Sequence, residues 1–302
     1  MPQIVHDPDH MRALVVEARA AGRRVGFVPT MGALHAGHAS LVTRAARECD
    51  DVAVSIFVNP TQFGPQEDFA RYPRTLDADT TLLAPLGVSW IYVPEVTAVY
   101  PPDDATRIVV GGPAVRFEGE RRPGHFDGVA TVVCRLFLAV PADAAYFGAK
   151  DWQQTLVVKR MVRDLGLSIE IVVCPTVREA DGLAMSSRNA YLSAADRGRA
   201  VALSKSLCQA ERLWADGAAP AVIEQTMRET MESHGVDVDY AALADPESLE
   251  PLSADASQAV ALVAGRLGST RLIDNRTLLG RGSSERSRAA DSSSTSARGL
   301  AR

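Results

Sequence analysis

The stretch that decides the fold is residues 25–60, which read VGFVPTMGALHAGHASLVTRAARECDDVAVSIFVNP. Its first six residues are apolar enough for a buried strand, Gly32 loosens the turn that follows, and residues 38–48 carry apolar side chains at helical spacing. A second apolar run, residues 52–58, comes directly afterwards. A strand, a helix and a strand in so short a span are typical of a βαβ unit, whose strands are parallel and whose helix packs on the sheet.

The same alternation continues as far as residue 178. We expect further helices at 77–86, at 127–139 and after Asp151, and further strands at 88–93, 144–148 and 169–174. Asp151 is placed to cap the helix that follows it. The pattern predicts an α/β fold, with a Rossmann-like parallel-sheet domain over residues 1–178.

The character of the sequence changes after residue 190. Ser193 and Gly217 bracket one predicted helix, and Pro220 and Gly235 bracket another. Three strand-like pieces follow without a long helix between the last two, near 236–243, 259–264 and 271–274. We therefore expect a smaller α+β domain with antiparallel strands over residues 179–280.

Composition narrows the class of protein. The 302 residues include 32 Lys and Arg against 37 Asp and Glu, a net charge of −5. Residues 281–302 hold five Arg, two acids and one large apolar residue, Leu300, so we expect this tail to be disordered. The rest of the chain then carries a charge of −8, which argues against a nucleic-acid partner because binding to phosphate backbones needs clustered Lys and Arg.

The sequence also predicts a cytoplasmic protein without a membrane partner. The first thirty residues contain no apolar run after a basic start, so no secretory signal is visible. The most apolar later stretch, residues 129–140, is broken by Arg135 and is too short to span a bilayer. Four widely spaced Cys residues form no CxxC pair, and we interpret them as buried free thiols.

The sharpest local signal is His35-Ala36-Gly37-His38, between the first strand and its helix. Ligands of open parallel sheets bind beyond the carboxyl ends of the strands, and amides at a helix N-terminus favour phosphate. Two imidazoles three residues apart could therefore face one phosphate ligand. The alternatives are a solvated histidine pair at a helix start and, with less support, a zinc site, for which no further ligands recur at suitable spacing.

Two later segments carry polar side chains at comparable places. Residues 148–154, GAKDWQQ, follow a strand, and Lys150 could meet a phosphate there, although Asp151 is also explained as a cap and Gln153 and Gln154 as surface amides. The segment Met185-Ser186-Ser187-Arg188 lies in a Gly- and Ser-bearing stretch, where hydroxyls and a guanidinium suit a polyphosphate. A solvated linker is the alternative for this segment.

Two further loops follow apolar segments. In residues 59–63, NPTQF, the neutral Gln62 could orient hydroxyls or a carboxylate. Residues 122–126, RPGHF, form the other loop. Ordinary turns are the alternative for both.

These motifs together resemble the pantoate:beta-alanine ligase (pantothenate synthetase) family, within the class I adenylate-forming superfamily. PTMGALHAGH, FVNPTQF, YPRT, GAKDWQQ and AMSSRN occur in unbroken order, and the resemblance spans residues 25–275. It implies a Rossmann-like ATP-binding domain, a smaller C-terminal lid and a homodimer. Ala36 stands where the family commonly has Glu, and Trp152 where it commonly has Tyr.

The resemblance also implies roles for individual residues. Gln62 and Gln154 should hold pantoate, and Gln62 should also face beta-alanine. His38 matches a proton donor or transition-state group, with His35, Lys150, Ser186, Ser187 and Arg188 stabilising phosphate charge. The ATP site should comprise Met31, Gly32, Ala33, Leu34, His35, Ala36, Gly37, His38, Gly148, Ala149, Lys150, Asp151, Val177, Met185, Ser186, Ser187 and Arg188. Mg²⁺ is expected on the phosphates, with no protein ligand assigned.

The expected reaction is ATP-dependent condensation of pantoate with beta-alanine through a pantoyl-adenylate, releasing AMP and pyrophosphate. Three alternatives share part of the pattern. Another nucleotidylyltransferase would keep the histidine motif without the paired Gln residues. An aminoacyl-tRNA synthetase would need a basic tRNA surface, and a nucleotide sensor would bind ATP without turnover.

Overall fold

The computed structural model describes residues 1–65, 67, 69–253 and 255–280. The tail expected to be disordered, residues 281–302, lies outside the described residues. The chain divides into two compact units, Met1–Ala190 and a second that begins at Tyr191, so the division falls later than the expected position at residue 178. The reason is that the strand ending at Cys174 is followed by a segment that folds back on itself. An isolated bridge pairs Arg178 with Ala184 in this segment.

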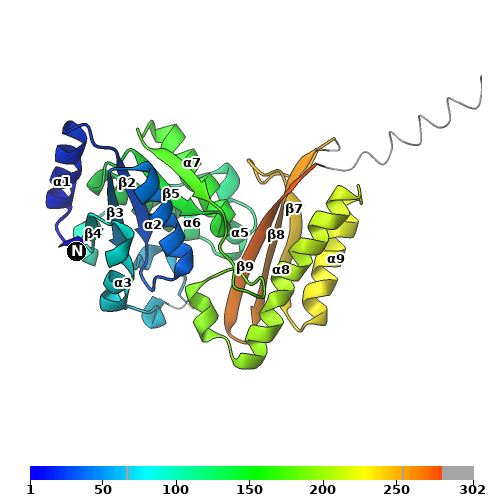
Figure 1. The fold of residues 1–302 in the computed structure, drawn as a ribbon. Helices are drawn as coiled ribbons and strands as arrows, with labels where there is room; N and C mark the ends of the chain where they lie inside the picture. The colour runs from blue at the N-terminus through cyan, green and yellow to red at the C-terminus, as the bar shows by residue number, and fades with distance from the viewer. Residues whose placement is uncertain (66, 68, 254, 281–302) are drawn as a thin grey trace, which may run out of the picture. The chain divides into compact units, whose positions relative to one another are not determined.

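The first unit contains a six-stranded parallel sheet in the order β1-β4-β3-β2-β5-β6. The chain runs outward from β2 through β3 and β4 and then returns to β5 on the other side of β2 (Figure 1). The strand order therefore reverses between β2 and β5, and ligands of such sheets bind beyond the strand ends at this point. The strands are β1 Gln3–Val5, β2 Val25–Thr30, β3 Asp51–Ile56, β4 Trp90–Tyr92, β5 Ala144–Gly148 and β6 Glu170–Cys174.

The helices of this unit form two buried apolar clusters with the sheet. One cluster joins Met11 and Val15 of α1 to the apolar side of α6, and the other joins Leu41 and Val42 of α2 to β3 and β4. The helices are α1 Pro8–Ala20, α2 Ala36–Glu48, α3 Leu76–Leu83, α4 Val96–Val99, α5 Glu118–Arg121, α6 His125–Ala139 and α7 Trp152–Leu165. Short 3-10 turns lie at Pro60–Gln62, Phe69–Arg71, Ala84–Leu86, Gly112–Ala114, Ala149–Asp151 and Ser187–Tyr191.

The second unit has the predicted α+β composition. Its helices are α8 Ala194–Ala215 and α9 Pro220–Ser233, and its antiparallel strands β7 Asp237–Ala244, β8 Gln258–Leu267 and β9 Thr270–Leu279 pair in that order. The Ser193 side chain accepts a hydrogen bond from the Asp196 amide at the start of α8, as a helix cap does. In the described part of the chain, no helix has the length and hydropathy needed to cross a membrane.

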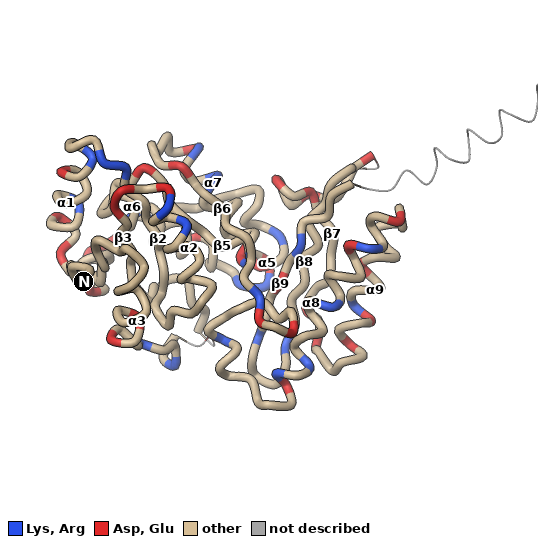
Figure 2. The backbone as a smooth tube through the Cα atoms, in the orientation of Figure 1, with Lys and Arg blue, Asp and Glu red and all other residues tan. Residues whose placement is uncertain are grey.

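Every strand and long helix predicted from residue 25 onward is present, with boundaries shifted by a few residues. The expected α/β fold with a smaller α+β domain is confirmed. Strand β1 and helix α1, which precede residue 25, were not predicted, and neither were the four-residue helices α4 and α5. Figure 2 shows Lys and Arg interspersed with Asp and Glu along the tube in both units.

Candidate active site

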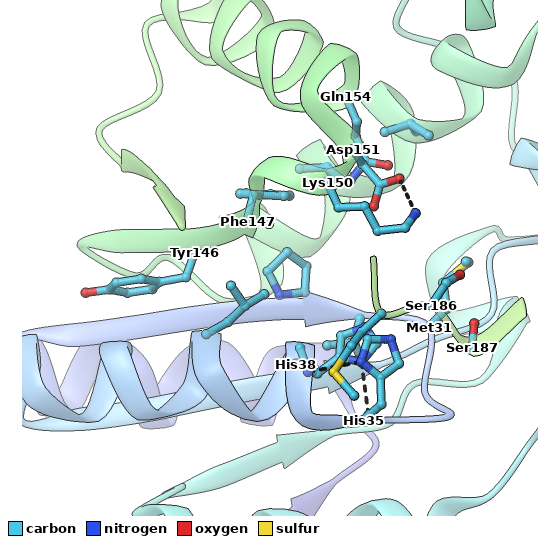
Figure 3. A pocket seen from close by; sticks show the side chains of 18 of the residues that line it. Met31, His35, His38, Tyr146, Phe147, Lys150, Asp151, Gln154, Ser186 and Ser187 are labelled. Atoms are coloured by element: carbon cyan, nitrogen blue, oxygen red, sulfur yellow. Dashed lines mark hydrogen bonds and ion pairs between the residues drawn. The ribbon is translucent and has the colours of Figure 1, made fainter. Parts of the chain in front are cut away.

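A pocket lies in the first unit beyond the ends of β2 and β5, where the reversal of strand order predicts a ligand site. Its walls come from the end of β2, the start of α2, the β5–α7 junction and the segment after β6 (Figure 3). Every residue that lines it belongs to Met1–Ala190. The segments that the sequence analysis selected separately thus meet at one place.

Most of the predicted site residues line this pocket. Those that do are Met31, His35, Gly37, His38, Gln62, Gly148, Lys150, Asp151, Gln154, Val177, Met185, Ser186, Ser187 and Arg188. The structure does not place Gly32, Ala33, Leu34, Ala36 and Ala149 among the lining residues. Three of these five, Gly32 to Leu34, shape the turn that carries the histidine motif.

That turn needs residues in the left-handed backbone region and a buried acceptor. Gly32 has a φ of 80° and Ala33 a φ of 52°. The amides of Ala33 and Leu34 donate to the two carboxylate oxygens of Asp79, at 3.0 and 2.8 Å. Asp79 is only 2% exposed and lies in α3, far from the motif in sequence, so the sequence analysis missed it. A side chain at Gly32 would also meet Asp79 and Ile56 at 3.0 Å.

The two motif histidines are fixed by backbone amides at the start of α2. The His35 amide donates to His38 Nδ1 at 3.3 Å, and the Gly37 amide donates to His35 Nδ1 at 3.1 Å. Because each Nδ1 accepts, each neutral ring carries its proton on Nε2. The ring centroids are 4.2 Å apart. The pair therefore presents two Nε2–H donors close together.

The His38 ring does not carry a positive charge at physiological pH. Burial, together with the neighbouring His35, lowers the pKa of His38 from its ordinary value to about 3. Burial and then Lys150 lower the pKa of His35 as well. Both rings are thus neutral hydrogen-bond donors at physiological pH.

Lys150 and Asp151 form an ion pair beside the histidines. Lys150 Nζ lies 3.4 Å from Asp151 Oδ1 (Figure 3). Burial raises the pKa of Asp151, but Lys150 and then Arg188 outweigh it, so the pKa stays below the ordinary value and the carboxylate is ionised. Asp151 occupies the position before α7 without a side-chain bond to the helix. The expectation that it caps α7 was wrong, because its carboxylate faces Lys150 instead.

Residues 185–188 are held in the pocket wall by hydrogen bonds. The Met185 amide donates to the Val177 carbonyl at 3.0 Å, and the Arg188 amide donates to Ser186 Oγ at 3.3 Å. Ser187 Oγ lies 3.4 Å from the hydroxyl of the buried Tyr72. These contacts do not fit the alternative of a solvated linker.

Gln62 enters the pocket with a defined amide orientation. Asn59, which is 1% exposed, donates from Nδ2 to Gln62 Oε1 at 3.1 Å. Gln62 Nε2 consequently points to Met31 Sδ, at 3.1 Å, and supplies the donor. Asn59 itself lines the pocket, and the sequence analysis gave it no role.

The pocket also has an apolar side. Phe57 and the α6 residues Val129, Val132, Val133 and Leu136 line it. Helix α6 was predicted only as a helix, although its long apolar run is visible in the sequence. Amide groups beside apolar side chains suit a small organic molecule that has both polar groups and a hydrocarbon part.

Gln153 has a structural role. It is 5% exposed, donates to the carbonyls of Pro113 and Arg116 at 2.8 and 2.6 Å, and accepts from the Glu118 amide at 3.1 Å. The interpretation of Gln153 as a surface amide was wrong. Its neighbour Gln154 lines the pocket.

The side chains that line the pocket fit Mg²⁺ better than a metal ion whose ligands all come from the protein. Among the described residues, no group of three or more His, Cys, Asp or Glu side chains converges on a possible metal position. Asp151 supplies the one carboxylate among the residues lining this pocket. Mg²⁺ commonly keeps several waters and binds substrate phosphates plus one or two carboxylates, so it could be carried by the phosphates beside Asp151.

The parallel sheet reverses its strand order between β2 and β5, and side chains that can bind phosphate lie beyond the ends of these strands. This arrangement is that of a nucleotide-binding α/β enzyme. Comparison with known proteins identifies the family. The family model described as Pantoate-beta-alanine ligase matches residues 3–277, and the chain belongs to this family.

Curated relatives agree over nearly their whole length. The pantothenate synthetase of Acidiphilium cryptum is 52% identical over 274 residues, covering 90% of this chain and 98% of that protein. The pantothenate synthetase of Thermodesulfovibrio yellowstonii is 46% identical over 275 residues, with the same coverage.

Solved structures show the same fold. The pantothenate synthetase from Thermus thermophilus has a TM-score of 0.86 at 48% identity, covering 91% of this chain and 98% of that one. The pantoate-beta-alanine ligase from Francisella tularensis, described as complexed with Beta-gamma ATP and Beta-alanine, has a TM-score of 0.76 at 34% identity, covering 91% and 97%.

Proposed function

We propose that this protein joins pantoate to beta-alanine at the expense of ATP, through a pantoyl-adenylate, and releases AMP and pyrophosphate. The observation that carries the proposal is the convergence of Nε2–H donors, an ammonium and a guanidinium with two glutamines in one pocket of a family member. The Francisella relative, solved with a nucleotide and beta-alanine, supports the same substrates for this chain.

In the first half-reaction, a pantoate carboxylate oxygen attacks the α-phosphorus in line with the departing pyrophosphate. The new P–O bond forms as the bond to the β-phosphate oxygen breaks, and the electron pair leaves with pyrophosphate. His35 and His38 donate Nε2–H bonds to phosphate oxygens, while Lys150 and Arg188 oppose the growing negative charge. Ser186 and Ser187 supply hydroxyl donors from the opposite wall.

In the second half-reaction, the uncharged amine of beta-alanine attacks the pantoyl carbonyl. The C–N bond forms, the bond from the carbonyl carbon to the AMP oxygen breaks, and the amine loses a proton to the surroundings. The mixed anhydride hydrolyses in water, so the pocket must exclude water at this stage. Gln62 and Gln154 would keep the acyl group oriented between the two steps.

Four further parts of the proposal rest on the family resemblance or, for the location, on the sequence. Mg²⁺ would neutralise phosphate charge, with Asp151 as the nearby carboxylate. A lid role for the residues after the first unit, a homodimer and a cytoplasmic location complete the expectation. Sedimentation at several protein concentrations tests the dimer, and a single monomer species would contradict it.

The decisive test is a substrate-dependence assay. AMP and pyrophosphate should accumulate only when ATP, pantoate and beta-alanine are all present. Exchange of labelled pyrophosphate into ATP should need pantoate alone. Exchange without pantoate would favour another nucleotidylyltransferase, and exchange dependent on an amino acid and tRNA would favour an aminoacyl-tRNA synthetase. ATP binding with no turnover under any combination would favour a nucleotide sensor.

A further inference from the structure

The start of α6 contacts the turn that carries Gln62 from outside the pocket. His125 and Arg122 do not line the pocket, yet both reach the Gln62 main chain. For residues 122–126 an ordinary turn was the alternative to a functional loop, and the proposed mechanism gives them no part. Their contacts concern the one turn, Pro60–Gln62, on which the orientation of Gln62 depends.

His125 holds the Gln62 carbonyl with a defined ring tautomer. His125 Nδ1 lies 2.9 Å from the Gln62 oxygen, and His125 Nε2 lies 3.0 Å from Arg122 Nη1. A carbonyl only accepts and a guanidinium only donates, so Nδ1 carries the proton and Nε2 accepts. Burial, followed by the charge of Arg122, lowers the pKa of His125 to about 4, which keeps this ring neutral.

Arg122 links the Pro60–Gln62 turn to the carboxylate of Glu67, which follows this turn in the sequence. Its Nε and Nη2 donate to the two Glu67 oxygens at 2.6 Å each, and Nη2 lies 3.4 Å from the Gln62 carbonyl oxygen. The Arg122 and Glu67 side chains are 17% and 27% exposed. A forked guanidinium in so sheltered a position fixes direction as well as distance.

Gly128 allows α6 to approach this closely. A Cβ on Gly128 would lie 2.4 Å from the Thr61 carbonyl oxygen and 2.8 Å from the Gln62 Cα. The Gly128 carbonyl also accepts from Asn59 Nδ2 at 3.1 Å. The backbone of the turn thus lies directly on the first turns of the helix.

We propose that His125 and Arg122 are positioning residues, which hold the Gln62 main chain so that its side-chain amide stays aimed into the pocket. The inference rests on the proposed function, in which Gln62 binds pantoate. Asn59 fixes the side-chain end of Gln62, and His125 with Arg122 fixes the main-chain end. Because both ends are ordered before the substrate arrives, pantoate binding does not have to bear the entropy of ordering this residue.

Replacing His125 tests the main-chain contact. His125→Phe keeps a ring of similar size and removes the donor, and we expect the KM for pantoate to rise about tenfold, the scale of one hydrogen bond, with the KM for ATP unchanged. His125→Asn should restore the pantoate KM because its amide can still donate to the carbonyl. An unchanged pantoate KM in His125→Phe would overturn the proposal, as would a failure of His125→Asn to improve on it.

The chain offers a matched control. His6 Nδ1 also bonds a main-chain carbonyl, that of Val93 at 2.7 Å, and His6 does not line the pocket. His6→Phe removes the same kind of bond and should leave the pantoate KM unchanged. An equal rise in both variants would mean that the effect is general structural loosening, which contradicts a role through Gln62.

A double-mutant cycle with Gln62→Ala identifies the route of the effect. If His125 acts through the Gln62 side chain, His125→Phe should change the pantoate KM little once that side chain is absent. A full tenfold rise in the double variant would overturn the proposal. If Gln62→Ala alone leaves pantoate KM and kcat unchanged, the assignment of Gln62 fails and the positioning role fails with it. A defective Gln62→Ala with an unaffected His125→Phe refutes only the positioning role.

Arg122→Lys is a second, independent variant. A single ammonium cannot reproduce the fork that joins Glu67, His125 and the Gln62 carbonyl, so a selective rise in the pantoate KM is expected. If His125→Phe does not fold, this variant carries the test by the same comparison of pantoate with ATP. A wild-type pantoate KM in folded Arg122→Lys would contradict the proposal.

Discussion

At the scale of single residues, Lys150 and His38 contribute to the pocket in different ways. Lys150 brings a full positive charge, held beside Asp151, whereas His38 brings a neutral Nε2–H donor with a pKa lowered to about 3. Burial disfavours charge on the imidazole, and the neighbouring His35 adds to this effect. The site therefore combines an ammonium with hydrogen-bond donors that need no protonation at neutral pH.

Lys150→Ala and His38→Ala should each slow adenylation by about 10²-fold or more, because each loses a donor that stabilises charge in the transition state. Pantoate-dependent exchange of pyrophosphate into ATP measures this step. Lys159, exposed on the same helix α7, provides the control, and Lys159→Ala should exchange at the wild-type rate. Near-normal exchange in Lys150→Ala or His38→Ala would remove that residue from the mechanism.

At the scale of elements, the strand-to-helix junction depends on a helix that is distant in sequence. The turn from β2 into α2 contains two left-handed residues, and its amides are satisfied by Asp79 of α3. Thr75 Oγ1 donates to the same carboxylate at 3.2 Å. The position of the histidine motif thus rests on packing between α3 and this turn as well as on α2 itself.

Asp79→Asn should loosen this turn, because an amide oxygen can replace one carboxylate oxygen while the NH₂ group opposes the second backbone donor. We expect the dissociation constant for ATP to rise about tenfold and the melting temperature to fall. Calorimetric titration and thermal unfolding measure the two effects. Asp77→Asn, on the exposed side of α3, should change neither, and wild-type ATP affinity in Asp79→Asn would refute the role of this carboxylate.

The missed elements show what local patterns leave out. Helix α1 begins with Asp7 as its cap and Pro8 in its first turn, and it buries Met11, Val15 and Ala18, so its signals were present in the sequence. Strand β1 has only three residues and pairs at the edge of the sheet with β4. A strand this short has too few residues for its alternation to be distinguished from a loop.

At the scale of the whole molecule, the neutral histidines link stability to pH. The pKa of His125 is lowered to about 4 and that of His38 to about 3, both below the ordinary value near 6.5. At pH values between the lowered and the ordinary pKa of these histidines, the unfolded chain binds more protons than the folded chain. The free energy of unfolding therefore rises with pH in this range and falls on acidification below about 6.5. For His125 the loss at pH 5 is about 2 kcal/mol.

Comparing melting temperatures at pH 7.5 and pH 5.0 tests this link. The wild type should lose more stability on acidification than His125→Asn, which keeps a donor to the Gln62 carbonyl but has no group that titrates. Glu67 and Asp151 are present in both proteins, so protonation of these carboxylates does not distinguish them. An equal fall in the two proteins would contradict a neutral His125 in the folded protein.

The sequence by itself determined the α/β class, the order of the strands and long helices from residue 25 onward, the family and the segments that supply the pocket. These features follow from local periodicity, from turn residues and from motifs that are contiguous in the chain. The net charge follows from the composition, and the mixing of positive and negative residues along the chain (Figure 2) follows from their order in the sequence.

Only the tertiary structure decided how those segments operate together. It showed that Asp79 supports the histidine turn, that Asn59 and His125 hold Gln62 from its two ends, and that Asp151 pairs with Lys150 without capping α7. It also fixed the histidine tautomers and their neutral charge state. The physical reason is that hydrogen-bond partners and burial depend on residues brought together across the sheet, and neither is encoded in the spacing of neighbours along the chain.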